Sequence, residues 1–335
     1  MRKCYRTFLC LLLLLCPHLN RFGLTLDITR DTIRQCQQDG TIAITSCNGK
    51  GAYTALCREA RDNLRALGVG HLIITHEQHV CDRLEQWDCC ATTSWLANWS
   101  DLSTAAYLIR WLGVRKALNM GVDVILQDCD VVWTSNPTAT LRAQAPVIQG
   151  LREVGTAFPF NAGLLFFKSS SSAARTVVKT IVQRAKTFLR AQSTGNTAIL
   201  AKHGIASECA NSSNIDRMVF DQGLLNDAIE SVALNITAYT RSTILCDNDR
   251  RPIHFEETWT GPGESNSCTE LEQVDELACL APCNIFASWL WNCPGQTTSG
   301  DKVSWNVSTP LALGYHFVGV PLENKLRLMQ QVLRT

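Results

Sequence analysis

Two aspartates spaced two residues apart, Asp128 and Asp130, are the residues of this sequence best suited to chemistry. In an extended chain, side chains at positions i and i+2 point to the same side, so both carboxylates can face one ligand. Their oxygens are hard ligands of the kind that divalent cations prefer, and a bound cation can neutralise an anionic leaving group such as diphosphate. A short Asp-x-Asp pattern also occurs by chance at solvated strand ends. The apolar segments 124–126 and 131–133 on either side favour the metal site.

The segments around this pair alternate between strand-like and helix-like patterns. Apolar runs predict strands over 41–46, 71–75, 122–126, 158–168 and 237–245, and helical spacing predicts helices over 53–67, 102–120, 173–192 and 219–233. A strand–helix–strand order implies right-handed parallel crossovers, and hence an α/β fold with a mostly parallel central sheet and flanking helices. Ligands of such sheets bind beyond the carboxyl ends of the strands, which is where the two aspartates stand.

Composition narrows the class of protein further. The chain has 335 residues, of which 46% are hydrophobic, and this is enough apolar material for a sizeable core. Its 31 basic residues against 30 acidic ones leave a net charge of +1, which excludes a strongly basic nucleic-acid binder. Because no internal repeat or long linker interrupts residues 24–335, we expect a single domain there.

The N-terminus and the cysteine content point to a secretory compartment. Residues 1–23 place basic residues before a short apolar run, which predicts a signal peptide; a short signal-anchor is the alternative. Glycosylation sequons begin at Asn98, Asn211, Asn235 and Asn306. Sixteen cysteines also favour an oxidising environment. We therefore expect the secretory pathway, and within it the Golgi lumen, with membrane contact only through the possible anchor.

The cysteines divide into groups. Three lie in the predicted leader, so thirteen remain, and this odd number predicts at least one free thiol, for which Cys129 is the candidate. Six others are expected to form disulfides that staple the C-terminal region: Cys209, Cys246, Cys268, Cys279, Cys283 and Cys293. The C-x3-C spacing of Cys279 and Cys283 leaves a zinc site as an alternative, although no Cys/His pair at finger spacing accompanies it.

The segment 124–137, VILQDCDVVWTSNP, resembles the Asp-x-Asp motif of GT-A glycosyltransferases. More narrowly, it is similar to the nucleotide-diphospho-sugar transferase domain of glycosyltransferase family 77. Further segments resemble this family's motifs in the same order, over about residues 41–333: SCNGKGAYT at 46–54, FNAGLLFFK at 160–168, DQGLLN at 221–226, and HFVG at 316–319 with Lys325 beyond it. The resemblance implies a GT-A, Rossmann-like fold. It also implies a retaining enzyme that transfers xylose, galactose or arabinose from a UDP-sugar to a glycan or glycoprotein.

The resemblance assigns the metal and phosphate ligands. Asp128, Asp130 and His316 would hold Mn²⁺ or Mg²⁺, and Asp128 would also contact the ribose. Lys325 would pair with the diphosphate. The family often has more residues between this histidine and its glycine, so His316 competes with His254, which is otherwise a core histidine or an acceptor-side base.

The remaining roles concern the donor. Asn161, together with Gly163 of the same motif, and Asp221 would bind the donor sugar, and Gln222 would lie near its anomeric carbon. The resemblance places Ser46, Asn48 and Gly49 against the nucleotide.

Two other functions remain open from the sequence. A haloacid dehalogenase-type phosphatase would use Asp128 as nucleophile and Asp130 as acid. A secreted carbohydrate-binding glycoprotein without catalysis could also keep this fold. Neither alternative accounts for the ordered motifs as well as a glycosyltransferase does.

Overall fold

The computed structural model describes residues 28–83, 89–95, 102–144, 146–152, 160–194, 198, 221–233, 277–280, 286–288, 296–299, 302–305, 313–317 and 320–334. The leader, the four sequons, the expected strand 237–245 and His254 lie outside these residues. Within the described ranges, no helix combines the length and hydropathy needed to cross a membrane.

The centre of the described part of the chain is a seven-stranded sheet with the order β3-β2-β1-β4-β7-β6-β8. The strands are β1 (Thr41–Cys47), β2 (His71–Thr75), β3 (Cys90–Thr92), β4 (Asp123–Gln127), β6 (Ile148–Arg152), β7 (Phe160–Phe167) and β8 (Ala278–Leu280). Strands β3, β2, β1 and β4 are mutually parallel, whereas β7 runs antiparallel to both β4 and β6. The predicted α/β fold with a mostly parallel sheet is confirmed.

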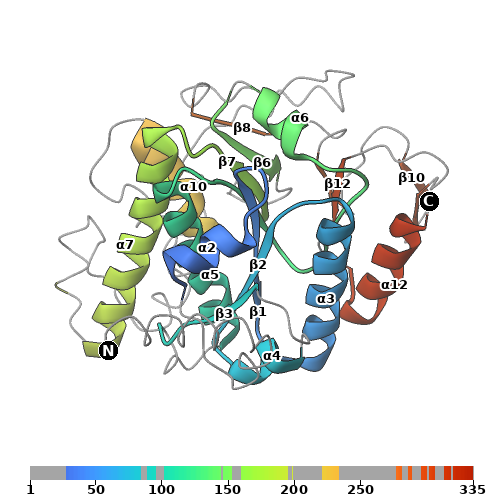
Figure 1. Ribbon diagram of the computed structural model, residues 1–335, viewed down its shortest axis with the longest axis horizontal. Helices are drawn as coiled ribbons and strands as arrows, with labels where there is room; N and C mark the ends of the chain where they lie inside the picture. Colours follow the sequence, from blue (N-terminus) through green and yellow to red (C-terminus); the bar gives the residue numbers. More distant parts are fainter. Residues whose placement is uncertain are drawn as a thin grey trace, which may run out of the picture.

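Helices cover both faces of this sheet (Figure 1). One face carries α2 (Arg30–Cys36), α5 (Leu102–Asn119), α7 (Ser172–Thr194) and α10 (Asp221–Ala233), and the other carries α3 (Gly51–Ala66) and α12 (Leu322–Leu333). Alternate residues of a strand enter different clusters: Leu126 of β4 packs with the first group of helices, and Ile125 packs on the opposite side. Burial on both faces explains why the central strands are continuous apolar runs.

Strand β7 contains a bulge over residues 161–164, next to the expected donor-binding residues. Gly150 of β6 pairs with Leu165, but the next pair joins Arg152 to Phe160, so four residues of β7 oppose one of β6. Phe160 and Leu165 both face the larger core cluster although they are five residues apart, which shows that the alternation changes phase between them. A bulge of this kind changes the direction of the side chains of residues 161 and 162.

A second, three-stranded sheet lies beside the end of β4. It has the order β5-β12-β9, with β5 (Val131–Trp133), β12 (Gly314–His316) and β9 (Phe286–Ser288). The antiparallel pairing of β12 with β5 places His316 opposite Val131, the residue that follows Asp130. Smaller elements are α4 (Gln78–Arg83), α6 (Thr138–Ala143) and the hairpin of β10 (Gln296–Ser299) with β11 (Lys302–Trp305).

The cysteines are described in part. Cys129 is a free buried thiol, as predicted. A disulfide that the sequence did not predict joins Cys81 of α4 to Cys90 of β3. The side chains of the six C-terminal cysteines lie outside the described residues, so their disulfides stay a prediction.

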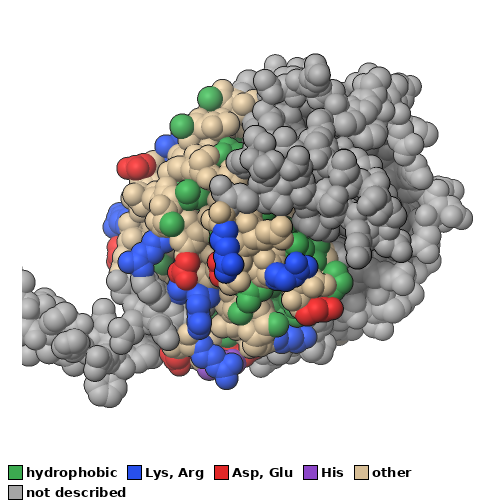
Figure 2. All heavy atoms as spheres, turned by 90° about the vertical axis from the view of Figure 1, so that its right-hand side faces the viewer, with side chains coloured by type: hydrophobic (Ala, Val, Ile, Leu, Met, Phe, Trp, Pro, Cys, Tyr) green, Lys and Arg blue, Asp and Glu red, His purple; other side chains and the backbone are tan. Residues whose placement is uncertain are grey.

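On the face that carries α3 and α12, the described surface mixes charges. Figure 2 shows lysine and arginine side chains interspersed with acidic and hydrophobic ones on the described part of this face. Such a surface agrees with the small net charge of the sequence.

Candidate active site

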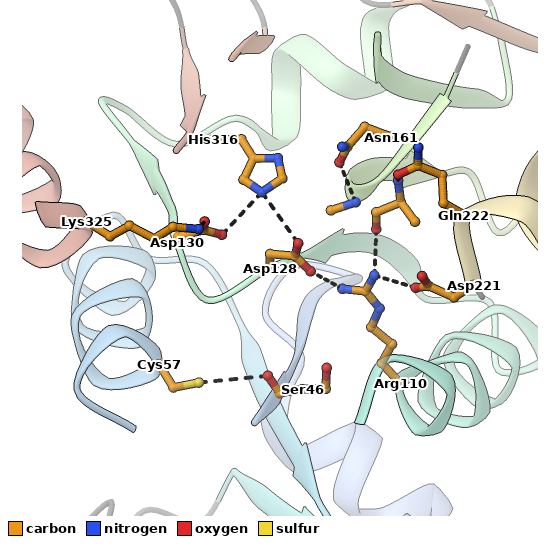
Figure 3. A network of polar contacts seen from close by, with 12 residues as sticks. Ser46, Cys57, Arg110, Asp128, Asp130, Asn161, Asp221, Gln222, His316 and Lys325 are labelled. Atoms are coloured by element: carbon orange, nitrogen blue, oxygen red, sulfur yellow. Dashed lines mark hydrogen bonds and ion pairs between the residues drawn. The ribbon is translucent and has the colours of Figure 1, made fainter. Parts of the chain in front are cut away.

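Three predicted metal ligands converge at the carboxyl end of β4. His316 Nε2 lies 3.4 Å from Asp128 Oδ2 and 3.2 Å from Asp130 Oδ1. One potential ligand atom from each of the three side chains lies within 4.8 Å of the others. Figure 3 shows the imidazole directed at both carboxylates, with Lys325 of α12 paired to Asp130 from the other side. Residues almost two hundred positions apart in the sequence therefore form one polar cluster.

Backbone hydrogen bonds hold the two aspartates in place. The N–H of Asp128 donates to Gly163 O of β7 at 2.8 Å, which extends the β4–β7 pairing by one residue. The N–H of Phe317 donates to Asp130 O at 3.1 Å, which extends the β5–β12 pairing in the same way. The turn between β4 and β5 is thus anchored to both sheets.

Gly163 is required by close packing at this point. A Cβ atom on Gly163 would stand 2.3 Å from His316 Cε1 and 2.5 Å from Asp128 Oδ2. Because real side chains do not approach so closely, any larger residue would push these two ligands apart. The structure therefore gives Gly163 a role in shaping the metal site.

The charges in the cluster reinforce one another. Burial lowers the pKa of His316, but the neighbouring Asp130 and Asp128 outweigh burial and raise that pKa to about 9. For Asp130, burial acts in the opposite direction and raises the pKa. The charges of His316 and Lys325 outweigh this effect, so the pKa of Asp130 is lowered. Without a cation, His316 is therefore protonated at neutral pH and neutralises part of the acidic pair.

The donor atoms suit a divalent cation. Two carboxylates and one imidazole nitrogen form a ligand set that Mn²⁺ and Mg²⁺ accept, because carboxylate oxygens dominate it. His316 Nε2 already stands where it could replace its proton by a metal bond. A cation bound there would compete with Lys325 for Asp130, and this competition would release the ammonium group toward other anions.

Arg110 belongs to the site although it is part of none of the motifs in the sequence. Its side chain is 1% exposed, and its guanidinium binds Asp128, Asp221 Oδ2 at 2.6 Å and the carbonyl of Ala162 at 2.9 Å (Figure 3). The sequence contains one indication of this role: Arg110 is the single charged residue in the apolar helical segment 105–114. A charge buried there needs a partner of opposite charge.

The residues expected to bind the donor sugar surround the bulge of β7. Asn161 Oδ1 accepts a hydrogen bond from the N–H of Gly163 at 2.7 Å. Gln222 Oε1 accepts one from the N–H of Ala162 at 3.5 Å. Asp221 begins α10 and is buried; burial raises its pKa despite the ion pair with Arg110. The structure brings all three residues around the ion pair of Arg110 with Asp128 (Figure 3).

The expected nucleotide loop follows β1, the parallel neighbour of β4. Ser46 lies near the end of that strand (Figure 3). Asn48 Oδ1 accepts from the N–H of Lys50 at 3.3 Å, and Gly49 has a φ of +73°. Because this φ favours glycine, and because the Glu77 carboxylate occupies the space of a Cβ atom there, a side chain at Gly49 would distort the loop.

A family match agrees with this geometry. Residues 106–238 match the family model described as nucleotide-diphospho-sugar transferase. The matched segment contains Arg110, both aspartates of the pair, Asn161 and Asp221, whereas His316 and Lys325 lie beyond it. This match confirms the predicted resemblance and supports the class of glycosyltransferase for the chain.

Three solved structures show distant likeness. The galactosyltransferase LgtC, in complex with donor and acceptor sugar analogues, is 9% identical, with 87% of this chain and 95% of that chain covered and a TM-score of 0.39. A glycosyltransferase involved in glycosylation of the major capsid of PBCV-1 is 10% identical, with 87% and 100% covered and a TM-score of 0.39. Mouse xyloside xylosyltransferase 1 is 11% identical, with 83% and 97% covered and a TM-score of 0.37. No curated protein sequence matches the chain.

Proposed function

We propose that this protein is a metal-dependent, retaining glycosyltransferase that moves a sugar from a UDP-sugar to a glycan or glycoprotein acceptor. The observation that carries the proposal is the convergence of Asp128, Asp130 and His316 within 4.8 Å at the carboxyl end of β4. The two aspartates lie in the segment that matches nucleotide-diphospho-sugar transferases, and His316 lies beyond it. The sugar is of the xylose, galactose or arabinose class.

The three ligands would hold Mn²⁺ or Mg²⁺, and a cation in that position supplies a Lewis acid that neutralises charge on the departing diphosphate. Lys325 supports the same task, since its ammonium group is already directed at the cluster and can pair with a phosphate once Asp130 binds the cation. Asp128 is held by Arg110, so its free movement is restricted and the ligand geometry is organised in advance.

We propose retention of anomeric configuration because the family that the chain resembles retains it, and the contacts of the carboxylates bear on the route. Asp128 contacts Arg110 with one oxygen and His316 with the other, and Asp221 is paired with Arg110. Because both groups are already held in ion pairs, we assign neither of them as a covalent nucleophile. We propose that the acceptor attacks on the face from which UDP leaves, and that a diphosphate oxygen takes the acceptor's proton.

The same contacts weigh against a phosphatase of the haloacid dehalogenase type. That reaction needs Asp128 as a free nucleophile, whereas both of its oxygens are engaged. A chain that releases phosphate from an aryl phosphate and ignores UDP-sugars would favour the phosphatase instead.

We further propose that residues 24–335 act as one domain in the secretory pathway, in the Golgi lumen, after the leader is cleaved or while it anchors the chain. The predicted leader and the sequons support this location. Fractionation of cells that express the tagged full chain, with glycosidase treatment of the product, tests it.

A donor screen tests the function directly. The purified chain is incubated with UDP-xylose, UDP-galactose or UDP-arabinose and Mn²⁺, and UDP release is measured. We expect turnover of one donor that needs the cation and is lost in Asp130→Ala, with retained configuration in the product by NMR. The matched control is Asp62→Ala, which removes a half-exposed aspartate on α3 and should turn over normally. Undiminished sugar transfer by Asp130→Ala would contradict the assignment.

A further inference from the structure

Three buried cysteines from separate parts of the chain meet beneath the proposed metal site. Cys47 lies at the end of β1, Cys57 lies in α3, and Cys129 lies in the turn between β4 and β5. All three are free thiols and belong to one hydrophobic cluster. The proposed glycosyltransferase reaction uses none of them.

The sheet register explains why these cysteines meet. Strands β1 and β4 are parallel neighbours in which Ile44 pairs with Leu126, and Cys47 and Cys129 each follow three residues later. Helix α3 packs on the same face, so that Cys57 Sγ donates to the carbonyl of Ser46 at 3.8 Å (Figure 3). The neighbouring thiols of Cys129 and Cys47, together with burial, raise the pKa of Cys57.

Cys129 couples this thiol cluster to the metal ligands because it is the residue between Asp128 and Asp130. The two carboxylates face His316, while the Cys129 side chain packs into the hydrophobic cluster that contains Cys57. The flanking backbone is fixed by the hydrogen bonds from Asp128 N–H and to Asp130 O. A displacement of Cys129 Sγ is therefore expected to strain these hydrogen bonds or to turn the two carboxylates away from His316.

We propose that Cys57 and Cys129 form a redox modification site, in which a small-molecule disulfide of the glutathione class converts them into an internal disulfide that weakens cation binding. Cys129 is the entry point, because it is 8% exposed whereas Cys47 is 1% and Cys57 is 0% exposed. The effect on the cation rests on the proposed function, but the disulfide does not.

The chemistry is two successive thiol–disulfide exchanges. Cys129 loses its proton and attacks one sulfur of the reagent, which breaks the reagent's S–S bond, forms a mixed disulfide and releases the first thiol. Cys57 then loses its proton and attacks Cys129 Sγ in the mixed disulfide, and the second thiol leaves. Two cysteines are oxidised and one disulfide is reduced to two thiols. The new bond holds the two sulfur atoms at about 2.05 Å, and we expect it to draw the Asp128–Asp130 turn toward α3.

Disulfide mapping of the full chain tests the proposal. The protein is incubated with oxidised glutathione, alkylated, digested and analysed by mass spectrometry, with the Cys81–Cys90 disulfide as internal reference. We expect a Cys57–Cys129 link that reduced glutathione reverses. Persistence of both free thiols, or a Cys47–Cys57 link in its place, would overturn the proposal.

Calorimetry of Mn²⁺ binding measures the consequence. Oxidation should weaken Mn²⁺ binding by about 10- to 100-fold, the range typical when the support of metal ligands is disturbed. Cys129→Ala lacks the attacking thiol and should bind Mn²⁺ equally before and after oxidised glutathione, whereas the matched control Cys47→Ala should still form the link and lose affinity. Equal Mn²⁺ affinity of linked and reduced wild-type protein would refute the coupling.

Disulfide mapping on the wild-type chain shows whether the Cys57–Cys129 link forms, even if a variant does not fold. Absence of Mn²⁺ binding before oxidation would count against the proposed function, while the mapped link would still decide the modification site. The two failures are therefore distinguishable.

Discussion

At the scale of single residues, Arg110 is central to the site, and no motif in the sequence predicted this role. It lies in the interior of the protein and neutralises two carboxylates that come from different elements, Asp128 and Asp221. Its third contact, with the carbonyl of Ala162, adds the bulge of β7 to this network. A buried charge is stable only when it is paired, so removal of Arg110 would also destabilise its partner carboxylates.

Replacing Arg110 by Met should therefore destabilise the fold and the site together. The substitution keeps a long side chain but leaves the buried Asp221 and the partly buried Asp128 without the guanidinium, and we expect a loss of about 3–5 kcal/mol of unfolding free energy. Urea denaturation measures this loss. The control Arg34→Ala removes the exposed ion pair with Asp31 and should cost less than about 1 kcal/mol. Equal losses in both variants would contradict the role of Arg110.

Gly163 allows a residue-scale test that separates the site from the fold. Gly163→Ala introduces a Cβ atom against His316 and Asp128, so we expect Mn²⁺ affinity to fall at least about tenfold and stability to fall by about 1–3 kcal/mol. Calorimetric titration and thermal unfolding provide the two readouts. Gly51→Ala is the matched control, because a Cβ atom at Gly51 meets nothing within 4 Å. Unchanged Mn²⁺ binding in Gly163→Ala would show that the ligands do not lie where the structure places them.

At the scale of elements, strand ends were predictable and pairing details were not. Apolar runs located β1, β2, β4 and β7 to within a few residues, because strands that are buried on both faces are continuously hydrophobic. The bulge in β7 depends on its register with β6, and no local pattern encodes that register.

The disulfide between α4 and β3 offers a test at this scale. It closes a loop between residues nine positions apart and ties the edge strand of the sheet to the preceding helix. The double variant Cys81→Ala/Cys90→Ala should lose about 2–3 kcal/mol of stability, since the unfolded chain regains the entropy of the open loop. Mn²⁺ affinity should stay within about twofold of the wild type, because neither cysteine contacts the ligands. A large loss of Mn²⁺ affinity would show that this edge supports the site.

At the scale of the whole molecule, an almost neutral protein joins several charged side chains into one network. The sequence has a net charge of +1, yet Asp128, Asp130, Asp221, Arg110, His316 and Lys325 form one connected network at the carboxyl end of the sheet. Attraction for an anionic donor can therefore come from a locally bound cation and needs no basic surface.

Global stability should report this network through pH. The pKa of His316 is about 9, above the ordinary value of 6.5, so its contribution to stability without metal is complete below about pH 6.5 and is lost as the pH rises through 9. Mn²⁺ must displace the same proton, so its affinity should rise by up to about tenfold per pH unit over this window. We expect the increase in Tm caused by Mn²⁺ to grow from pH 6.5 to 8.5. His316→Asn should remove the pH dependence, and an increase in Tm that stays constant with pH in the wild type would contradict the assignment.

The sequence by itself determined four strands of the central sheet, the alternation with helices and the position of Asp128 and Asp130 after a buried strand, because these features depend on local hydrophobic pattern. The family resemblance added His316, Lys325 and the donor-binding residues. Only the tertiary structure decided that Arg110 reaches Asp221, 111 positions away, and that three cysteines meet beneath the metal ligands. Such contacts depend on which strands are neighbours and in what register they pair. That choice is made by the packing of the whole sheet, and no segment of the chain encodes it alone.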